Sequence, residues 1–161
     1  MRVRDAVPAD AEAIAAVHVR AWQVAYAHVF PPERLAALDQ ATRARRWREG
    51  LESGWNALVI DDASGFVSVG PSRDVDGEGE LYAIYVDPEH WGTGRGRVLM
   101  DAALEALRED GFEEATLWVL DDNPRARRFY EAAGWTLDGA VKEDEHLDTP
   151  VREVRYRISL R

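Results

Sequence analysis

The residues with the clearest chemical potential form the turn Trp91-Gly92-Thr93-Gly94-Arg95-Gly96-Arg97. An apolar run at 81–86 precedes the turn, and an alanine-rich segment with helical periodicity follows it. Glycines let the main chain approach a ligand closely, and a helix start offers unpaired N–H groups and a partial positive charge. A strand, a glycine turn and a helix start therefore predict an anion site that fits a pyrophosphate, with an ordinary glycine-rich turn as the alternative.

Two familiar pyrophosphate motifs fail on spacing. A dinucleotide fingerprint needs a glycine three residues after Gly94, where Arg97 stands, and a triphosphatase loop needs Gly-Lys-Ser/Thr, whereas the only lysine is Lys142. The turn instead resembles the Gln/Arg-x-x-Gly-x-Gly/Ala signature of the GNAT acyltransferases, with Trp91 in place of Gln or Arg. The resemblance implies that the amides of the turn bind the pyrophosphate of acetyl-coenzyme A. The implied contacts are Gly92, Thr93, Gly94, Arg95, Gly96 and Arg97.

A second motif follows the buried run Leu117–Leu120. Asn123 is a good helix cap, Pro124 fits the first helical position, and Gly134 ends the helix. This segment resembles the family motif Asn-x-x-Ala-x-x-x-Tyr-x-x-x-Gly-Phe/Trp, and its matching residues are Asn123, Ala126, Tyr130, Gly134 and Trp135. Taken alone, the asparagine is most simply a cap and the tyrosine a surface residue. Both motifs together, in the family's order, favour the family.

Composition narrows the class of protein. The chain has 161 residues, of which 46% are hydrophobic and 31% charged, as in an ordinary soluble globule. Its net charge of −10 disfavours nucleic-acid binding and weakly favours cationic acceptors. The absence of cysteine excludes disulfides, thiolate metal sites and a cysteinyl intermediate. No segment resembles a signal peptide or a membrane span, so we expect a cytoplasmic location.

The expected fold follows from the order of elements. The resemblance implies an α/β (α+β) GNAT fold over a single domain, residues 1–161, with a mixed twisted sheet of about seven strands flanked by four helices. The charged segment Lys142–His146 is expected to be a loop. The expected strands are 2–4, 56–61, 66–69, 80–86, 115–120, 135–141 and 151–160, and the expected helices are 8–27, one or two within 33–50, 94–110 and 125–133.

Acyl transfer from a thioester to an amine needs a neutral nucleophile, a stabilised oxyanion and a proton for the thiolate. In the family two central strands splay apart and hold pantetheine between them. The resemblance implies that Ile84, Tyr85 and Val86 contact the thioester arm, together with Asn123 and Ala126. Tyr130 takes the general-acid position, because a phenol with a pKa of about 10 can protonate a thiolate whose acid has a pKa of about 8.5. The alternative is that Tyr130 only packs against the coenzyme.

The general base is expected at Glu80, where relatives often place a glutamate that works through water. Strand alternation puts Glu80, Tyr82, Ile84 and Val86 on one face unless a bulge intervenes. A solvated carboxylate at the strand end is the alternative. A base is unnecessary if the acceptor arrives as the free amine.

The acceptor pocket is expected beside the first helix. His18, Trp22 and Tyr26 lie at i, i+4 and i+8 on one stripe, although an aromatic stripe is more often core, above all for Trp22. Tyr82 and Trp118 carry the same two interpretations. His146 and its acidic neighbours are either an acceptor-side lid or a solvated charge run.

These residues predict an acetyl-coenzyme-A-dependent N-acetyltransferase that works by direct attack in a ternary complex and needs no metal. The expected acceptor is the primary amine of a small molecule or a peptide, with no nucleic-acid or membrane partner. Edge strands near the C-terminal end could pair two chains into a homodimer. The alternative function is a non-catalytic acyl-coenzyme-A sensor of the same fold.

Overall fold

The computed structural model describes residues 1–161 and contains the expected seven strands. The strands are β1 (Val3–Asp5), β2 (Asn56–Ile60), β3 (Gly65–Pro71), β4 (Gly79–Val86), β5 (Glu114–Leu120), β6 (Thr136–His146) and β7 (Thr149–Ser159). The helices are α1 (Ala11–Ala25), the short α2 (Pro32–Ala36), α3 (Gln40–Glu52), α4 (Arg95–Glu109) and α5 (Pro124–Ala132). None of these helices combines the length and the apolarity that a bilayer crossing requires.

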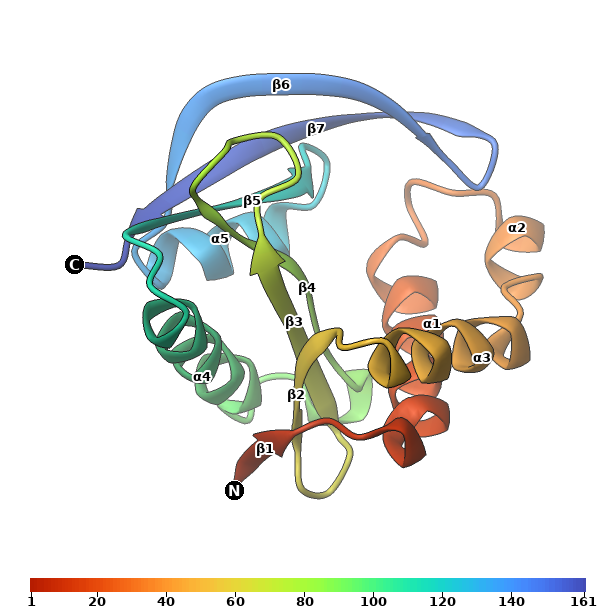
Figure 1. Cartoon of the computed structure of the whole chain (residues 1–161). Coiled ribbons are helices and arrows are strands. Elements are labelled where there is room, and N and C mark those ends of the chain that lie inside the picture. The colour runs from red at the N-terminus through yellow and green to blue at the C-terminus, as the bar shows by residue number, and fades with distance from the viewer.

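The seven strands form one mixed sheet in the order β1-β2-β3-β4-β5-β7-β6. Every neighbouring pair is antiparallel except β4 and β5, which run parallel. The parallel pair shares only two register positions, Gly79 with Ala115 and Glu80 with Thr116, and the strands then diverge (Figure 1). Backbone groups that face the gap beyond these positions have no strand partner across it. The splay expected from the resemblance is therefore present.

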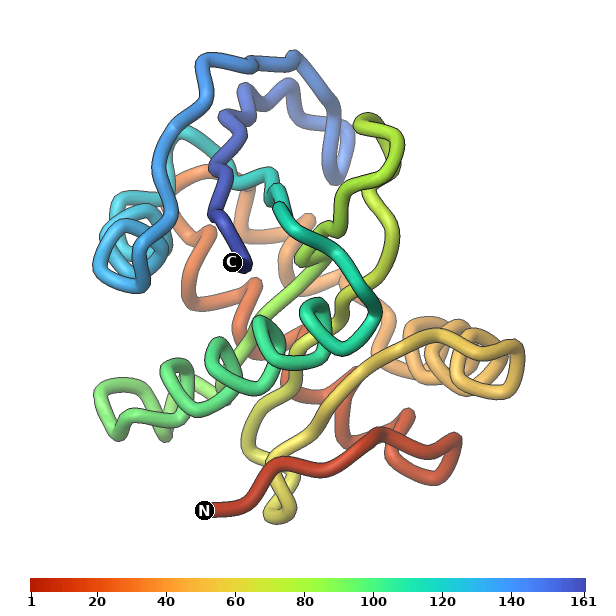
Figure 2. The backbone as a smooth tube through the Cα atoms, turned by 60° about the vertical axis from the view of Figure 1, so that its left-hand side comes forward, coloured from red at the N-terminus to blue at the C-terminus, as the bar shows by residue number.

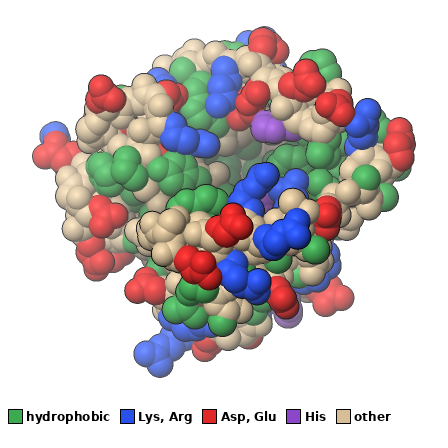
Figure 3. All heavy atoms as spheres, turned by 45° about the vertical axis from the view of Figure 1, so that its right-hand side comes forward, with side chains coloured by type: hydrophobic (Ala, Val, Ile, Leu, Met, Phe, Trp, Pro, Cys, Tyr) green, Lys and Arg blue, Asp and Glu red, His purple; other side chains and the backbone are tan.

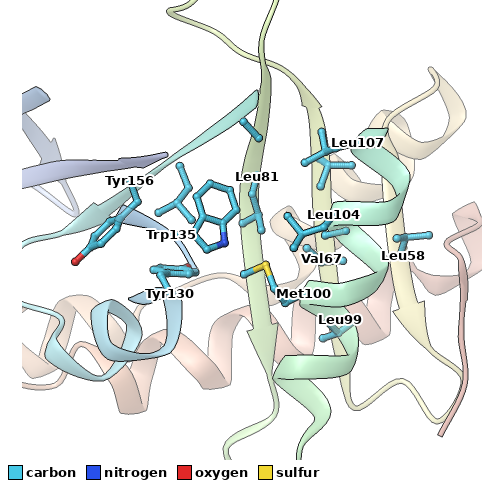
Figure 4. Close-up of a cluster of buried hydrophobic side chains, with 14 of the residues drawn as sticks. Leu58, Val67, Leu81, Leu99, Met100, Leu104, Leu107, Tyr130, Trp135 and Tyr156 are labelled. Atoms are coloured by element: carbon cyan, nitrogen blue, oxygen red, sulfur yellow. The ribbon is translucent and has the colours of Figure 1, made fainter. Parts of the chain in front are cut away.

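Helices cover both faces of the sheet. Helix α4 lies on one face, and α1 and α3 lie on the other (Figure 1); Figure 2 views the molecule from the side of α4, which crosses in front of the strands. On β2, Leu58 and Ile60 point into the core under α4, whereas Ala57 and Val59 point towards α1 and α3. Figure 4 shows the larger core, where Met100 and the leucines of α4 meet side chains of β2, β3 and β4. The aromatic rings of Tyr130, Trp135 and Tyr156 complete this core.

A bulge interrupts β4 beside the gap. The register of β3 against β4 slips by one residue, which leaves Tyr82 without a partner. Leu81 and Ile84 consequently pack in the same core although they are three residues apart. The expectation of one shared face from Glu80 to Val86 is therefore wrong, because the bulge reverses the alternation between them.

The β6–β7 hairpin is longer than the sequence suggested. The segment Lys142–His146, expected to be a loop, is strand and pairs with β7 throughout. Only Leu147 and Asp148 form the turn, both with left-handed backbone (φ 50° and 56°), as a two-residue hairpin of type I′ requires. The hairpin arches over the sheet towards α2 (Figure 1), and Arg34 of α2 lies 2.5 Å from the Asp148 carboxylate. The alternating charges are thus the two faces of a strand.

Candidate active site

A cavity of about 970 Å³ opens where β4 and β5 diverge. Its walls come from α1, β4, the start of α4, the end of β5, α5 and the β6–β7 hairpin. Its volume is at the upper end of the range of about 300–1,000 Å³ that is usual for small-molecule sites. Figure 3 shows a hollow in this face of the molecule, with hydrophobic side chains inside it and basic side chains and a histidine near its rim.

The glycine turn forms one end of the cavity. Gly92 and Gly94 have left-handed backbone (φ 75° and 87°), and an added Cβ at either would meet nothing within 4 Å. Helix α4 starts directly after Gly94 with no side-chain cap, and its first backbone bond runs from the Val98 N–H to the Gly94 carbonyl. The N–H groups of residues 92–97 consequently have no acceptor within the protein. They form a row of free donors at a helix N-terminus, which is an anion site.

Most of the predicted turn residues line this end. Gly92, Gly94, Arg95, Gly96 and Arg97 do so, whereas Thr93 does not. The Thr93 hydroxyl donates to the His90 carbonyl at 2.5 Å, and its oxygen accepts from Arg95. The Arg95 side chain also donates to Ser64 at 2.8 Å and to Asp62 at 3.1 Å. These two side chains therefore brace the turn, which leaves the backbone to meet the ligand.

Trp91, which stands where the family signature has Gln or Arg, lines the cavity. Its indole N–H donates to the Val86 carbonyl at 2.8 Å, which fixes the ring against the end of β4. The guanidinium carbon of Arg125 lies 3.7 Å from the centre of that ring. Arg125 lines the cavity with no carboxylate in ion-pair range, whereas Arg127 is engaged by Tyr156 and the Asp121 carbonyl. Arg128 also lines the cavity without an ion pair, so Arg125 and Arg128 are the α5 cations placed to meet a phosphate.

The second motif contributes the cavity wall opposite β4. The Asn123 side-chain oxygen accepts from the Ala126 N–H at 3.2 Å, and its amide nitrogen donates to the Tyr26 hydroxyl at 3.3 Å. Asn123 and Ala126 both line the cavity. The asparagine is therefore a helix cap that also ties α5 to α1.

Tyr130 is buried on the same wall, with 8% of its surface exposed. Its ring lies near those of Trp135 and Tyr156 (Figure 4), and it also packs against Phe129. Burial raises the pKa of Tyr130, and the nearby Tyr26 raises it further. The hydroxyl consequently keeps its proton at neutral pH, which is the form that a general acid needs.

The predicted residues of β4 all line the cavity, whereas only some of those of α1 do. Ile84, Tyr85 and Val86 are all in the wall, and the Tyr85 hydroxyl accepts from the Trp22 indole N–H at 2.9 Å. Burial raises the pKa of Tyr85 well above its ordinary value. His18 lies outside the wall and stacks on Tyr85, with 5.1 Å between ring centres; burial lowers the pKa of His18 to about 4.

The remaining aromatic residues predicted for the acceptor pocket also face the cavity. Trp22 and Tyr26 line it, although Trp22 also stacks on Phe30 at 5.6 Å between ring centres, so it serves core and wall together. Tyr82 and Trp118 line it as well. The ammonium group of Lys142 lies 4.4 Å from the centre of the Trp118 ring.

Glu80 does not line the cavity and is fully enclosed, with 0% of its surface exposed. One carboxylate oxygen accepts from the backbone N–H of Arg73 at 2.9 Å, and the other accepts from the Arg73 guanidinium at 2.5 and 3.2 Å. The alternative of a solvated strand-end carboxylate is therefore wrong. A base role for Glu80 through water stays a prediction, and the contacts give it a structural role in the β3–β4 connection.

We expect Glu80→Gln to lower the free energy of unfolding by about 1–2 kcal/mol, because an amide cannot accept all three bonds from Arg73, whose exposure screens part of the ion pair. Urea denaturation measures this loss, and Asp76→Asn in the same connection, where the side chain is exposed, should change the stability little.

Steady-state kinetics of the folded Glu80→Gln variant test the base role. A base that works through water predicts a fall in kcat of about 100-fold, and an unchanged kcat would contradict it.

The hairpin adds cavity residues that the sequence did not reveal. Lys142, Asp144 and His146 of β6 line the wall, and so does Glu153 of β7. Their signal was a spacing of two residues, with Glu143 and Glu145 in between. That spacing is typical of a strand with one face towards a site. His146, which the sequence predicts as part of either a lid or a solvated charge run, lies in the cavity wall.

Comparison with known sequences gives one family. The model of the acetyltransferase (GNAT) family matches residues 13–135. The uncharacterized N-acetyltransferase YuaI of Bacillus subtilis is 35% identical over 136 residues, which are 81% of this chain and 77% of YuaI. The mycothiol acetyltransferase of Beutenbergia cavernae is 35% identical over 120 residues, which are 72% of this chain and 40% of that protein. The chain thus spans about 40% of the length of this second relative.

Solved structures share the fold. The yncA protein of Salmonella typhimurium, determined with its cofactor acetyl-CoA, has a TM-score of 0.74 at 22% identity and covers 100% of this chain and 94% of its own. The paiA N-acetyltransferase of Thermoplasma acidophilum, in complex with coenzyme A, has a TM-score of 0.74 at 17% identity and covers 98% of each chain. At these identities the likeness shows the fold alone, and it confirms the architecture that the resemblance implied.

Proposed function

The chain belongs to the acetyltransferase (GNAT) family, and from this we propose that it transfers the acetyl group of acetyl-coenzyme A to a primary amine by direct attack in a ternary complex. The observation that carries the proposal is the arrangement inside one cavity. Free N–H donors of residues 92–97 stand at one end, the open edges of β4 and β5 lie in the middle, and the protonated phenol of Tyr130 lies in the wall.

The residues of the cavity fit acetyl-coenzyme A as a substrate. Donors at a helix N-terminus suit its pyrophosphate, and Arg125 on the Trp91 ring supplies a cation beside them. From Ile84 to Val86, β4 pairs with β3 on one side, and its other edge, which faces β5, has no strand partner. That edge can bond the amide-bearing arm in the manner of a neighbouring strand. The glycines at 92 and 94 leave space for the close approach of the diphosphate.

The reaction follows from these positions. The amine nitrogen attacks the thioester carbon, and a backbone N–H near Tyr85 would stabilise the oxyanion. When the carbon–sulfur bond breaks, the Tyr130 hydroxyl gives its proton to the departing thiolate. An acceptor that arrives as an ammonium ion first loses a proton to Glu80 through water, whereas a free amine does not need this step. In both cases the attacking nitrogen loses one further proton to solvent as the amide forms, and solvent returns a proton to the Tyr130 oxygen. Coenzyme A and the acetylated amine leave.

Thiol release tests the proposal. Acetyl-coenzyme A should bind in calorimetry, and free thiol should form only when a suitable primary amine is present, with a matching mass gain of one acetyl group on the amine. The sensor alternative predicts tight coenzyme binding and no thiol with any amine of a broad panel. Absence of coenzyme binding to folded protein would overturn both functions.

A further inference from the structure

The wall of the cavity away from the glycine turn carries a cluster of charged side chains on the β6–β7 hairpin. Asp144 and His146 project from the same face of β6, and Glu153 projects from β7. Their side-chain ligand atoms lie within 4.8 Å of one another. We call these three residues the acidic cluster.

The geometry of the acidic cluster leaves it with excess negative charge. The imidazole Nε2 of His146 lies 3.0 Å from Glu153 Oε1 and 3.7 Å from Asp144 Oδ2, so two carboxylates share one imidazole. Glu153 is 7% exposed, and no arginine or lysine lies in ion-pair range of it. Lys142 stands opposite Glu153 in the β6–β7 register, but its ammonium group lies over the Trp118 ring and makes no ion pair with Glu153. A buried carboxylate without a full cationic partner is costly, and a bound cation would relieve that cost.

Electrostatics divide the cavity into two ends. The glycine turn and Arg125 make one end attractive to anions, whereas Asp144 and Glu153 make the other attractive to cations. The Trp22 ring of α1 lies beside the acidic cluster, with 6.0 Å between its centre and that of the His146 ring. An aromatic wall beside carboxylates is suited to an alkylammonium group, because ring faces attract cations and alkyl chains alike.

On the basis of the proposed function, we propose that the acidic cluster binds a positively charged group of the acceptor, and that the acceptor is an aliphatic amine carrying a second ammonium group away from the reacting nitrogen. The first amine then lies in the gap between β4 and β5, while the second is held by Glu153 and Asp144. Lys142 could instead attract a carboxylate, which makes the sign of the preferred charge the point to test.

Three acceptors with four carbon atoms each compare the charge at the far end. 1,4-Diaminobutane, n-butylamine and 4-aminobutanoate end in an ammonium, a methyl and a carboxylate group, and the values for the diamine are divided by two because either of its amines can react. Thiol release with saturating acetyl-coenzyme A and EDTA should give the highest kcat/KM for the diamine and the lowest for the aminobutanoate. We expect kcat/KM for the diamine to exceed that for butylamine about tenfold or more, through a lower KM.

Variants assign the preference to the acidic cluster. Glu153→Gln, and separately the more exposed Asp144→Asn, should lower kcat/KM for the diamine about tenfold and leave that for butylamine nearly unchanged. Glu143→Gln on the outer face of β6 is the matched control and should alter neither value. Coenzyme affinity by calorimetry should stay constant in all three variants, because the acidic cluster lies away from the glycine turn.

The outcomes separate this inference from the proposed function. Turnover of butylamine with no preference for the diamine, or a preference for the aminobutanoate that Lys142→Gln abolishes, would overturn the inference and keep the acetyltransferase. A diamine preference that EDTA abolishes would assign the acidic cluster to a metal ion and overturn it too. If none of the acceptors is turned over, calorimetry measures binding of the diamine in the presence of coenzyme A. The inference is overturned if the diamine does not bind, or if it binds Glu153→Gln as tightly as the unchanged protein.

Discussion

Tyr130→Phe should lower kcat about 100-fold while the dissociation constant of acetyl-coenzyme A changes by less than about twofold. The phenylalanine keeps the ring that packs in the cavity wall and removes only the hydroxyl. In the proposed mechanism that hydroxyl is the proton source for the thiolate, so its loss should act in the transition state and hardly at all in binding. Steady-state kinetics with a reactive acceptor, together with calorimetry, measure the two quantities.

The raised pKa of Tyr130 adds a pH prediction. The active form is the protonated phenol, whose fraction falls only as the pH approaches its pKa. Since burial moves that pKa above the ordinary tyrosine value, ionisation of Tyr130 should cause no loss of kcat between pH 6 and about 9. A loss in that range that disappears in Tyr130→Phe would contradict this assignment.

Tyr156→Phe is the matched control. Its ring centre lies 6.2 Å from that of Tyr130, and its hydroxyl donates to Glu131 at 2.7 Å and accepts from Arg127 at 3.1 Å. Loss of these bonds should cost about 1 kcal/mol of stability without a change in kcat. If Tyr130→Phe instead weakened coenzyme binding and left kcat intact, Tyr130 would be a packing residue.

The parts of the site that depend on local chain geometry could be predicted from the sequence. Gly94 at a helix start and Asn123 before a proline each encode a backbone conformation within a few residues, and both occur as expected. The strand–turn–helix order around them carries the fold. Tyr130 followed from its place in the second motif.

Features that depend on pairing between distant segments could not be predicted. The bulge at Tyr82 arises in the register against β3, and Glu80, which precedes the bulge, is enclosed in a contact with Arg73. The engagement of Trp91 by Arg125 likewise joins two segments that neither local sequence describes. Strand alternation alone gives no information on where a register will slip.

The prediction of a loop at Lys142–His146 was wrong for a different reason. A run of charges is usually solvated, and this composition outweighed the two-residue spacing of Lys142, Asp144 and His146. In the fold the same run is half of a long hairpin, with one face exposed and the other in the cavity. Polar alternation is as strong a strand signal as apolar alternation when the inner face is a binding site.

Gly94→Ala should raise the dissociation constant of acetyl-coenzyme A about tenfold or more. At φ 87° an alanine is strained by about 1–2 kcal/mol, and relief of that strain would turn the free N–H groups of the turn away from the ligand. The new methyl group would also stand in space that is open at the cavity, where the diphosphate has to approach. Loss of one or two charge-assisted hydrogen bonds accounts for the size of the effect. Calorimetric titration measures it.

Gly111→Ala separates strain from recognition. Gly111 follows the other end of α4, whose 15 residues span about 22 Å. It has nearly the same backbone (φ 89°) with nothing within 4 Å of an added Cβ. Both variants should lose similar stability in urea, but only Gly94→Ala should lose affinity. Equal affinity in the two variants would mean that the turn does not hold the diphosphate. Because the strain is matched, any difference in affinity between them belongs to the glycine turn itself, through its N–H donors and through the space that the methyl group takes.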